Sequence, residues 1–206
     1  MTSLKKLIVL TALCIFSAGL HAQTKNEAIE AYNQAVGLMK TDVPGAINLF
    51  EKSIQISEQV GDSAVELKDK AIAVVPDLYY QLAYKNYTDK NVPGAISASK
   101  TTISVSDKYK NDKTKGRAET LLTQLYMLQG SNYFKGNENE KAIASFDSAM
   151  IVNPDYYKAL LPKAQVYRKI DNEAKFGETI DLFIEKAANE TDQVDQAKKL
   201  ALDFSD

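Results

Sequence analysis

One short segment of the sequence occurs three times, and this repetition constrains the fold more than any other feature. Residues 42–47 (DVPGAI) return at 91–96 (NVPGAI), and a shorter copy stands at 139–143 (NEKAI). The spacing of the copies is 49 residues and then 47, counted between their alanines. Repeats at such periods are typical of helical arrays, in which each helix pair buries its apolar side against its neighbours.

Helical periodicity runs through the chain after residue 22. Apolar residues recur at intervals of three and four, for instance at Ile47 and Phe50, and no segment alternates as a strand would. Pro44 and Pro93 fall in expected first helical turns, where proline loses no hydrogen bond. Pro76, within an apolar stretch, predicts either a boundary or a kink. Breaks are expected at Thr41–Asp42, Gly61–Asp62, Asn91, Lys113–Gly116, Gly136–Asn139, Asn153–Pro154 and Asn189–Thr191.

Residues 126–154 carry the most specific pattern. Large, small and aromatic residues stand on a first expected helix, and alanine, aromatic and proline positions follow on a second. These residues are Tyr126, Gly130, Tyr133, Ala142, Phe146, Ala149 and Pro154. The segment resembles a tetratricopeptide repeat (TPR), a family in which small residues let two antiparallel helices approach closely.

Three weaker copies extend the resemblance to about residues 26–188. In the copy at 77–110, Ser99 and Asn86 replace aromatic residues of the pattern. In the last copy, Leu160, Ala164 and Tyr167 fit a first helix, with Phe183 on the second helix after a longer loop. Since the spacing of 47–49 residues exceeds the usual period of about 34, we expect helices lengthened by about three to four turns.

The resemblance implies an all-α fold, a right-handed superhelical array of antiparallel helix pairs (a TPR-like α-solenoid) with extended helices. The predicted units are 26–60, 77–110, 123–154 and 157–188. A last amphipathic helix, 191–204, is predicted to cap the array, because terminal units need a polar outer face. Its alternative role is to bind a partner. Its apolar face holds Val194, Ala197, Ala201 and Phe204.

Residues 1–22 predict a secretory signal peptide. Lys5 and Lys6 precede a 14-residue apolar run, and small residues lead to a cleavage position after Ala22. The alternatives are an uncleaved anchor, for which the run is short, and a lipoprotein at Cys14, which Leu13 disfavours. Cleavage would remove the only Cys, the only His and two lysines, and would leave a net charge of −4.

A mature chain without His or Cys lacks the usual zinc ligands and the usual nucleophile–base pairs. No glycine-rich phosphate loop is present, and a formal charge of −2 for the whole chain does not favour nucleic acid. We therefore expect no catalysis, no cofactor and no metal. A carboxylate pair, as in glycoside hydrolysis, remains the alternative; Glu138, Glu140 and Asp147 fit a solvated helix surface better.

Proteins of the resembled family hold a peptide or protein segment in a groove lined by successive first helices. The resemblance implies that Asp77, Tyr80, Tyr84 and Tyr87 face this groove in the second unit, with the tyrosines in one stripe. Tyrosine offers apolar area with a polar tip, which suits recognition; the alternative is that these rings pack between extended helices. The equivalent positions in the other units are Tyr32, Val36, Met39, Gln124, Met127, Ser131, Phe134, Lys158, Leu161, Gln165 and Arg168.

Neither a carboxylate clamp nor the basic run of the sequence is expected to form a binding site. One subfamily clamps C-terminal carboxylates with Lys, Asn and Arg on the first helix, but the matching positions here are Tyr80, Tyr84 and Met127. The basic run within residues 108–117 is expected to be a solvated linker, with contact to an anionic polymer or lipid as the alternative.

Together these features predict an exported, non-catalytic scaffold or adaptor that binds a protein or peptide partner, either in the periplasm or outside the cell. Two alternatives remain. The chain is a structural subunit of a cell-envelope complex, which predicts a broad apolar patch, or it is a polysaccharide-binding or hydrolytic protein that uses carboxylates.

Overall fold

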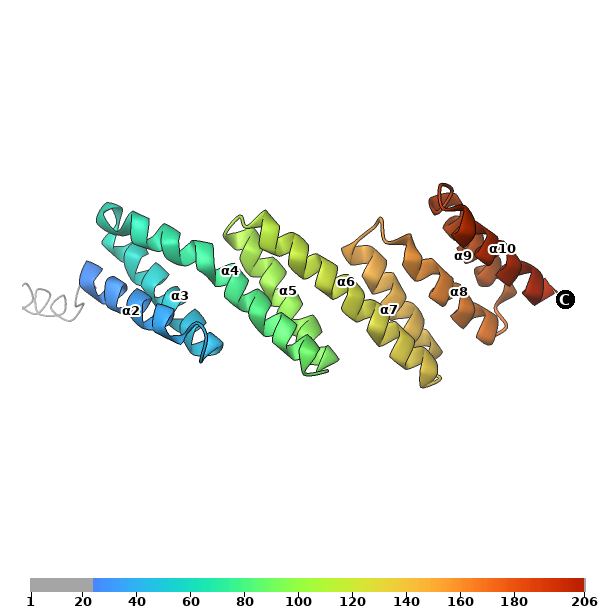
Figure 1. Cartoon of the computed structure of the whole chain (residues 1–206), viewed down its shortest axis with the longest axis horizontal. Coiled ribbons are helices and arrows are strands. Elements are labelled where there is room, and N and C mark those ends of the chain that lie inside the picture. Colours follow the sequence, from blue (N-terminus) through green and yellow to red (C-terminus); the bar gives the residue numbers. More distant parts are fainter. Residues whose placement is uncertain (1–23, 206) are drawn as a thin grey trace, which may run out of the picture. The chain divides into compact units, whose positions relative to one another are not determined.

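The computed structural model describes residues 24–205, and these fold into paired helices without a strand. This confirms the predicted all-α array of antiparallel helix pairs (Figure 1). The helices are α2 (Lys25–Leu38), α3 (Val43–Val60), α4 (Val65–Thr88), α5 (Val92–Lys108), α6 (Asp112–Lys135), α7 (Asn139–Val152), α8 (Leu160–Lys169), α9 (Glu173–Lys186) and α10 (Thr191–Ser205), with 3-10 turns at Asp62–Ala64 and Tyr157–Ala159. None of the helices in this part of the chain has both the length and the apolar character needed to cross a membrane.

The predicted signal peptide, with Cys14 and the cleavage position after Ala22, lies outside the described residues, as does the side chain of Phe204. The chain divides into two compact units between Val75 and Pro76, inside α4. Proline has no N–H, so it cannot complete the helical hydrogen bond to the preceding turn. The helix nevertheless continues through Pro76, which therefore marks a boundary between units rather than the end of a helix.

The first unit is built on the pairing of α2 with α3. Alanines at 28, 31 and 35 form the buried side of α2, which lets the helix lie close to Phe50 and its neighbours on α3. Ser53 on α3 donates a hydrogen bond to the carbonyl oxygen of Ala28 at 2.8 Å. The ring of Tyr32 meets that of Phe50 edge-on, with centroids 5.3 Å apart. Burying a side chain the size of Phe50 contributes roughly 1.5–3 kcal/mol.

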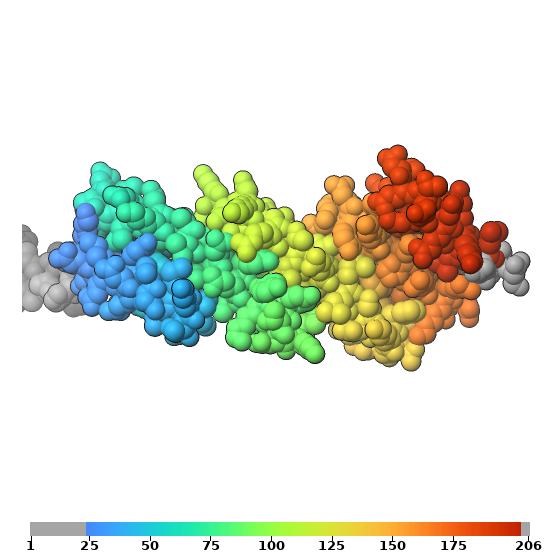
Figure 2. Space-filling view, viewed as in Figure 1, coloured from blue at the N-terminus to red at the C-terminus, as the bar shows by residue number. Residues whose placement is uncertain are grey.

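The second unit contains three successive apolar clusters. The first joins the second half of α4 to α5 and α6 around Ala83, Ala95 and Leu125. The next joins α6, α7 and α8 around Phe146, and the last joins α8, α9 and α10 around Phe183. In the space-filling view, α8 to α10 (orange to red) pack as one continuous body (Figure 2). Each cluster shares a helix with the next, so burial extends from pair to pair.

The predicted small residue at 130 brings α6 and α7 into close contact. A Cβ built on Gly130 would lie 2.6 Å from Cε1 of Phe146, closer than carbon atoms can approach. Phe146 is itself fully buried between the helices. This packing is what the resemblance to a tetratricopeptide repeat implies for these two positions.

The repeated DVPGAI and NVPGAI segments form helix starts. Asp42 and Asn91 are the N-caps of α3 and α5, and their side chains accept hydrogen bonds from the N–H groups of Gly45 (3.0 Å) and Gly94 (3.2 Å). A Cβ on either glycine would collide with the capping side chain. The motif therefore combines a cap, a proline in the first turn and a glycine that leaves room for the cap.

Four helix ends share a corner that the sequence did not predict. After α4, α5, α6 and α8, the second residue beyond the helix end has a left-handed backbone, and the N–H of the next residue donates to a carbonyl five residues earlier. This is the hydrogen bond of a Schellman motif. The left-handed residues are Lys90, Lys110, Asn137 and Asp171, with φ between 54° and 60°. Short, uniform corners hold consecutive helices antiparallel.

The structure corrects the expected break at Lys113–Gly116. Helix α6 already begins at Asp112, capped by Asn111, whose side chain accepts from the N–H of Thr114 at 3.0 Å. Most of the basic run thus belongs to a helix, and the linker interpretation was wrong. Gly116 lies on an exposed side of α6, and burial of Thr114 and Ala118 holds the helix together around it.

The longer loop expected before the helix of Phe183 was also wrong. The turn between α8 and α9 spans only residues 170–172, as short as the other corners. Phe176 stands at the corner position that alanine occupies in the preceding repeat, and this large residue concealed the regular spacing.

The predicted lengthening of the helices is confirmed: α4 and α6 have 24 residues each, whereas α2 and α7 have 14. Ten extra residues make about three turns.

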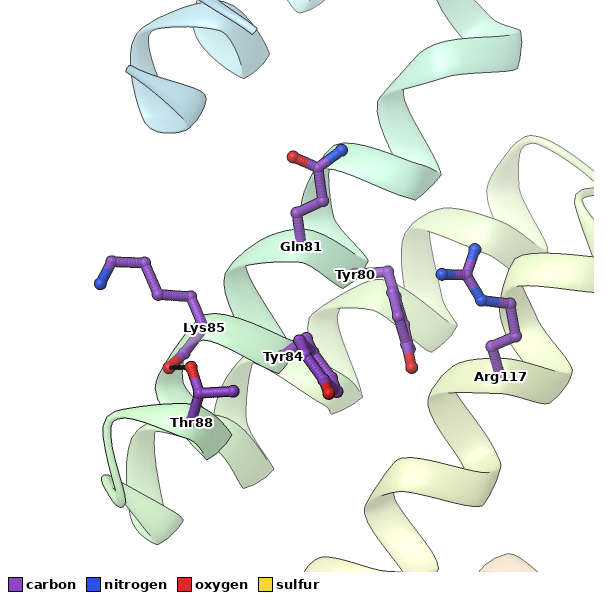
Figure 3. Close-up of a pocket in the computed structure, with 6 residues that line it drawn as sticks. All are labelled: Tyr80, Gln81, Tyr84, Lys85, Thr88 and Arg117. Carbon is purple, nitrogen blue, oxygen red and sulfur yellow. Dashed lines mark hydrogen bonds between the residues drawn. The ribbon is translucent and has the colours of Figure 1, made fainter. Parts of the chain in front are cut away.

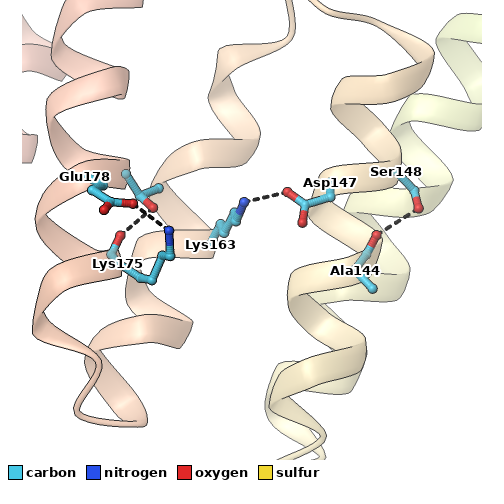
Figure 4. Close-up of polar contacts among 7 residues, drawn as sticks. Ala144, Asp147, Ser148, Lys163, Lys175 and Glu178 are labelled. Atoms are coloured by element: carbon cyan, nitrogen blue, oxygen red, sulfur yellow. Dashed lines mark hydrogen bonds and ion pairs between the residues drawn. The ribbon is translucent and has the colours of Figure 1, made fainter.

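Two ion pairs lie at the C-terminal end of the second unit, one between helices and one within a helix. The ammonium group of Lys163 on α8 lies 2.6 Å from a carboxylate oxygen of Asp147 on α7 (Figure 4). Lys175 and Glu178 form a second pair, 2.7 Å apart, within α9. The first of these crosses between elements and therefore fixes how α7 faces α8.

Candidate binding face

Three tyrosines project from the second half of α4. Because Tyr80, Tyr84 and Tyr87 are spaced by four and three residues, they lie on one side of the helix. The rings of Tyr80 and Tyr84 stack with centroids 6.3 Å apart, and those of Tyr84 and Tyr87 are tilted at 5.9 Å. Tyr84 is 49% exposed and Tyr87 38% exposed, whereas Tyr80 is half-buried. We call these three residues the tyrosine face.

Arg117 on α6 extends the tyrosine face. Its guanidinium carbon lies 4.0 Å from the ring centroid of Tyr80, within the range of a cation–π contact. One of its nitrogens, Nη1, donates to Oδ1 of Asp77 at 3.0 Å. The hydroxyl of Thr114, which is buried, donates to the same oxygen at 2.7 Å. Asp77 thus holds the arginine in place and joins α4 to α6.

Two pockets open beside the tyrosine face. The first, of about 460 Å³, is lined by Tyr80, Gln81, Tyr84, Lys85, Thr88 and Arg117 (Figure 3). The second, of about 540 Å³, is lined by Tyr87, Thr88, Lys90, Val92, Leu128 and Asn132. Thr88 belongs to both linings, so the two pockets adjoin. The charged residues in these linings are cationic.

The structure places the predicted groove residues in different surroundings. Asp77 and the three tyrosines lie together, as described above. Tyr32 and Met39 belong to the first unit, where the ring of Tyr32 packs on Phe50. Gln124 is exposed on α6, and Arg168 is half-buried on α8.

Met127 and Phe134, also predicted to line the groove, are half-buried on α6. Both pack against the cluster around Phe146, so much of their surface belongs to the core. Lys169 lies over the ring of Phe134, with its ammonium nitrogen 4.7 Å from the centroid. These two residues are therefore not part of the tyrosine face.

The sequence did not identify Arg117 and Leu128 as members of this site. The sequence pattern predicts a linker at Arg117 and gives no functional signal at Leu128. Both lie on α6 at helical spacing from Gln124, and that spacing is the signal that would have placed them on one side of the helix. Their approach to α4 depends on packing between helices.

The described part of the chain holds no group of three or more His, Cys, Asp or Glu side chains that could bind a metal ion. The tyrosine face itself presents aromatic surface, hydroxyl groups and positive charge. Such groups bind and orient a ligand.

No family model and no curated protein matches this chain. Solved structures give weak overall similarities. The TPR2AB-domain:pHSP90 complex of yeast Sti1 superposes with a TM-score of 0.39 at 12% identity, over 89% of this chain and 100% of that chain. A crystal structure of the MamA protein gives a TM-score of 0.36 at 15% identity, over 82% and 96% of the two chains. A second MamA structure gives 0.32 at 16% identity, over 76% and 93%.

Proposed function

We propose that this chain is a non-catalytic interaction scaffold that binds a segment of a partner protein on the tyrosine face. The observation that carries the proposal is the exposure of Tyr84 and Tyr87 beside two adjoining pockets. Large aromatic side chains left in solvent side by side favour recognition, because tyrosine loses little conformational entropy when it is covered. A helical array supplies a rigid base for such a surface.

The dimensions of the site support an extended segment as the ligand. Each pocket, at about 460 and 540 Å³, falls in the range of small-molecule sites and can accept one or two large side chains. Two adjoining pockets therefore suit a peptide whose successive side chains enter one after the other.

We further propose that the protein is exported and acts in the periplasm or outside the cell. The order of Lys5 and Lys6, an apolar run and Ala22 supports this proposal. Mass spectrometry of the protein recovered from the periplasmic fraction or the medium tests it. A mature chain that starts at Gln23 is the expected result, and an intact N-terminus in the cytosol would contradict it.

Site-specific photocrosslinking tests the binding role. A photoreactive phenylalanine analogue replaces Tyr84 in one variant and the highly exposed Ile151, which lines neither pocket, in a control. We expect a discrete crosslinked partner from position 84, which is lost when Tyr80 and Tyr87 are changed to Ala. The same products from both positions, or none from position 84, would refute the binding role.

A further inference from the structure

The two pockets differ in character along α6. Lys113, Arg117, Gln124 and Leu128 follow one another at helical spacing on one side of this helix. The N-terminal end of this row is cationic and its C-terminal end is apolar. On α4, Tyr80 stands beside Arg117, and Tyr87 shares its pocket with Leu128. The row on α6 therefore runs from a cationic end to an apolar end, with the tyrosines of α4 beside it, and Lys90 adds one positive charge to the second pocket.

Arg117 is prepared to receive an anion. The cation–π contact with Tyr80 and the hydrogen bond to Asp77 restrain its side chain before any ligand arrives. Its side chain remains 45% exposed, and the guanidinium carries N–H donors besides the one that Asp77 accepts. A planar guanidinium binds a carboxylate through two parallel hydrogen bonds, and a fixed guanidinium loses less entropy in doing so.

The other charges of the pocket linings have the same sign. Lys85 lines the first pocket and Lys90 the second. Lys85 already pairs with Asp89 at 2.7 Å, but both side chains are largely in solvent, where such a pair is weak and exchanges readily. Charge complementarity therefore favours a negatively charged ligand.

From this geometry we infer the chemical class of the partner segment. It is an extended peptide with Asp or Glu at one end and an aromatic or aliphatic residue at the other. The carboxylate binds Arg117, and the apolar side chain enters the pocket of Tyr87, Val92 and Leu128. This inference rests on the proposed function and adds the composition and the direction of the bound segment.

Selection from a random peptide library displayed on phage tests this inference without knowledge of the natural partner. The full mature chain and its Arg117→Gln variant are immobilised separately, with Lys186→Gln as a control that removes an exposed positive charge of α9. We expect peptides with Asp or Glu near an aromatic or aliphatic residue to be enriched on the unaltered chain and on Lys186→Gln. On Arg117→Gln the acidic preference disappears.

Affinity measurements on selected peptides give the second readout. Arg117→Gln should weaken binding of an acidic peptide by at least about tenfold, because the charge-assisted hydrogen bonds to the carboxylate are lost. Arg117→Gln should not change the affinity for a peptide in which Gln replaces the Glu. Tyr87→Ala should weaken both peptides equally. Circular dichroism establishes that each variant is folded.

The other outcomes separate this inference from the proposed function. Enrichment of neutral aromatic peptides, with no effect of Arg117→Gln, overturns the acidic composition and leaves the scaffold role standing. No enrichment of any peptide overturns both. Displacement of the selected peptides by phosphatidylglycerol vesicles, with the same dependence on Arg117, would assign the cationic end to a lipid surface and overturn the inference.

Discussion

Gly130 on α6 faces the ring of Phe146 on α7 so closely that a Cβ at position 130 would lie 2.6 Å from Cε1. The ring is fully buried, so it cannot swing aside into solvent. The closeness of this helix pair therefore depends on the absence of one methyl group.

The clash introduced by Gly130→Ala is expected to cost about 1–3 kcal/mol of the free energy of unfolding, the usual effect of overpacking a core. Alanine favours a helix over glycine by about 1 kcal/mol, so the loss measured is the clash minus this gain. Gly116→Ala, in the same helix, is the matched control, because no atom lies within 4 Å of its Cβ. It should stabilise the protein. Urea denaturation of both variants measures the difference, and equal shifts would contradict the packing described.

The left-handed corners predict a stabilising substitution. Lys110 has φ of 55°, which costs a residue with a side chain about 1–2 kcal/mol. Glycine has no such cost but loses more entropy on folding, so Lys110→Gly should raise stability by about 0.5–1 kcal/mol. Lys100→Gly, within α5, should instead destabilise by about 1 kcal/mol. Thermal melts of the two variants should shift in opposite directions.

The cap of α5 predicts a graded effect. Asn91 accepts from the N–H of Gly94 and donates its own amide N–H to Oδ1 of Asn86 at 2.8 Å. Asn91→Ala removes both interactions and should cost about 0.5–2 kcal/mol. Asn91→Asp keeps the cap and loses only the donor, so it should cost less. Denaturation midpoints that are equal for the two variants would show that capping is not what the side chain contributes.

Tyr157 predicts a dependence of stability on alkaline pH. Its hydroxyl donates to a carboxylate oxygen of Glu190, and this hydrogen bond is the main reason that the pKa of Tyr157 is raised. Since the folded state holds the proton more tightly, the contribution is complete below the ordinary pKa of about 10 and is lost as pH rises through the raised pKa.

The measurement is the denaturation midpoint at a series of pH values from about 8 to 11. Tyr157→Phe should show a smaller loss of stability with rising pH than the unaltered chain. In Glu190→Gln, NMR titration of the Tyr157 ring should give a lower pKa than in the unaltered chain. A ring that titrates identically in both would refute the hydrogen bond as the cause.

The parts of the fold that sequence predicted are those with local causes. The helix breaks at Asp42 and Asn91, the prolines in the first turns that follow and the small residue at 130 act within a few residues or at a fixed spacing. The expected break at Lys113–Gly116 was wrong because glycine and alternating polar residues are weak signals, and the burial of Thr114 and Ala118 outweighs them. The loop before α9 is shorter than predicted, and Phe176 stands where the preceding repeat has alanine.

In the candidate site, too, the part with a local cause could be predicted from the sequence and the part that depends on packing could not. The tyrosine stripe follows from spacing on one helix, and the structure leaves Tyr84 and Tyr87 exposed and Tyr80 half-buried. The role of Asp77 and the position of Arg117 arise between α4 and α6, 40 residues apart in the sequence. Only the packing of two helices shows that these side chains meet.

One carboxylate oxygen of Asp77 accepts hydrogen bonds from both the buried hydroxyl of Thr114 and the partly exposed guanidinium of Arg117. A substitution at Asp77 would therefore disturb both the packing of α4 against α6 and the position of Arg117. Tyr84, Tyr87 and Leu128 project into solvent and are free of this double constraint in their exposed parts. We therefore expect copies of such a gene to vary at these three positions of the proposed binding face and to keep Asp77.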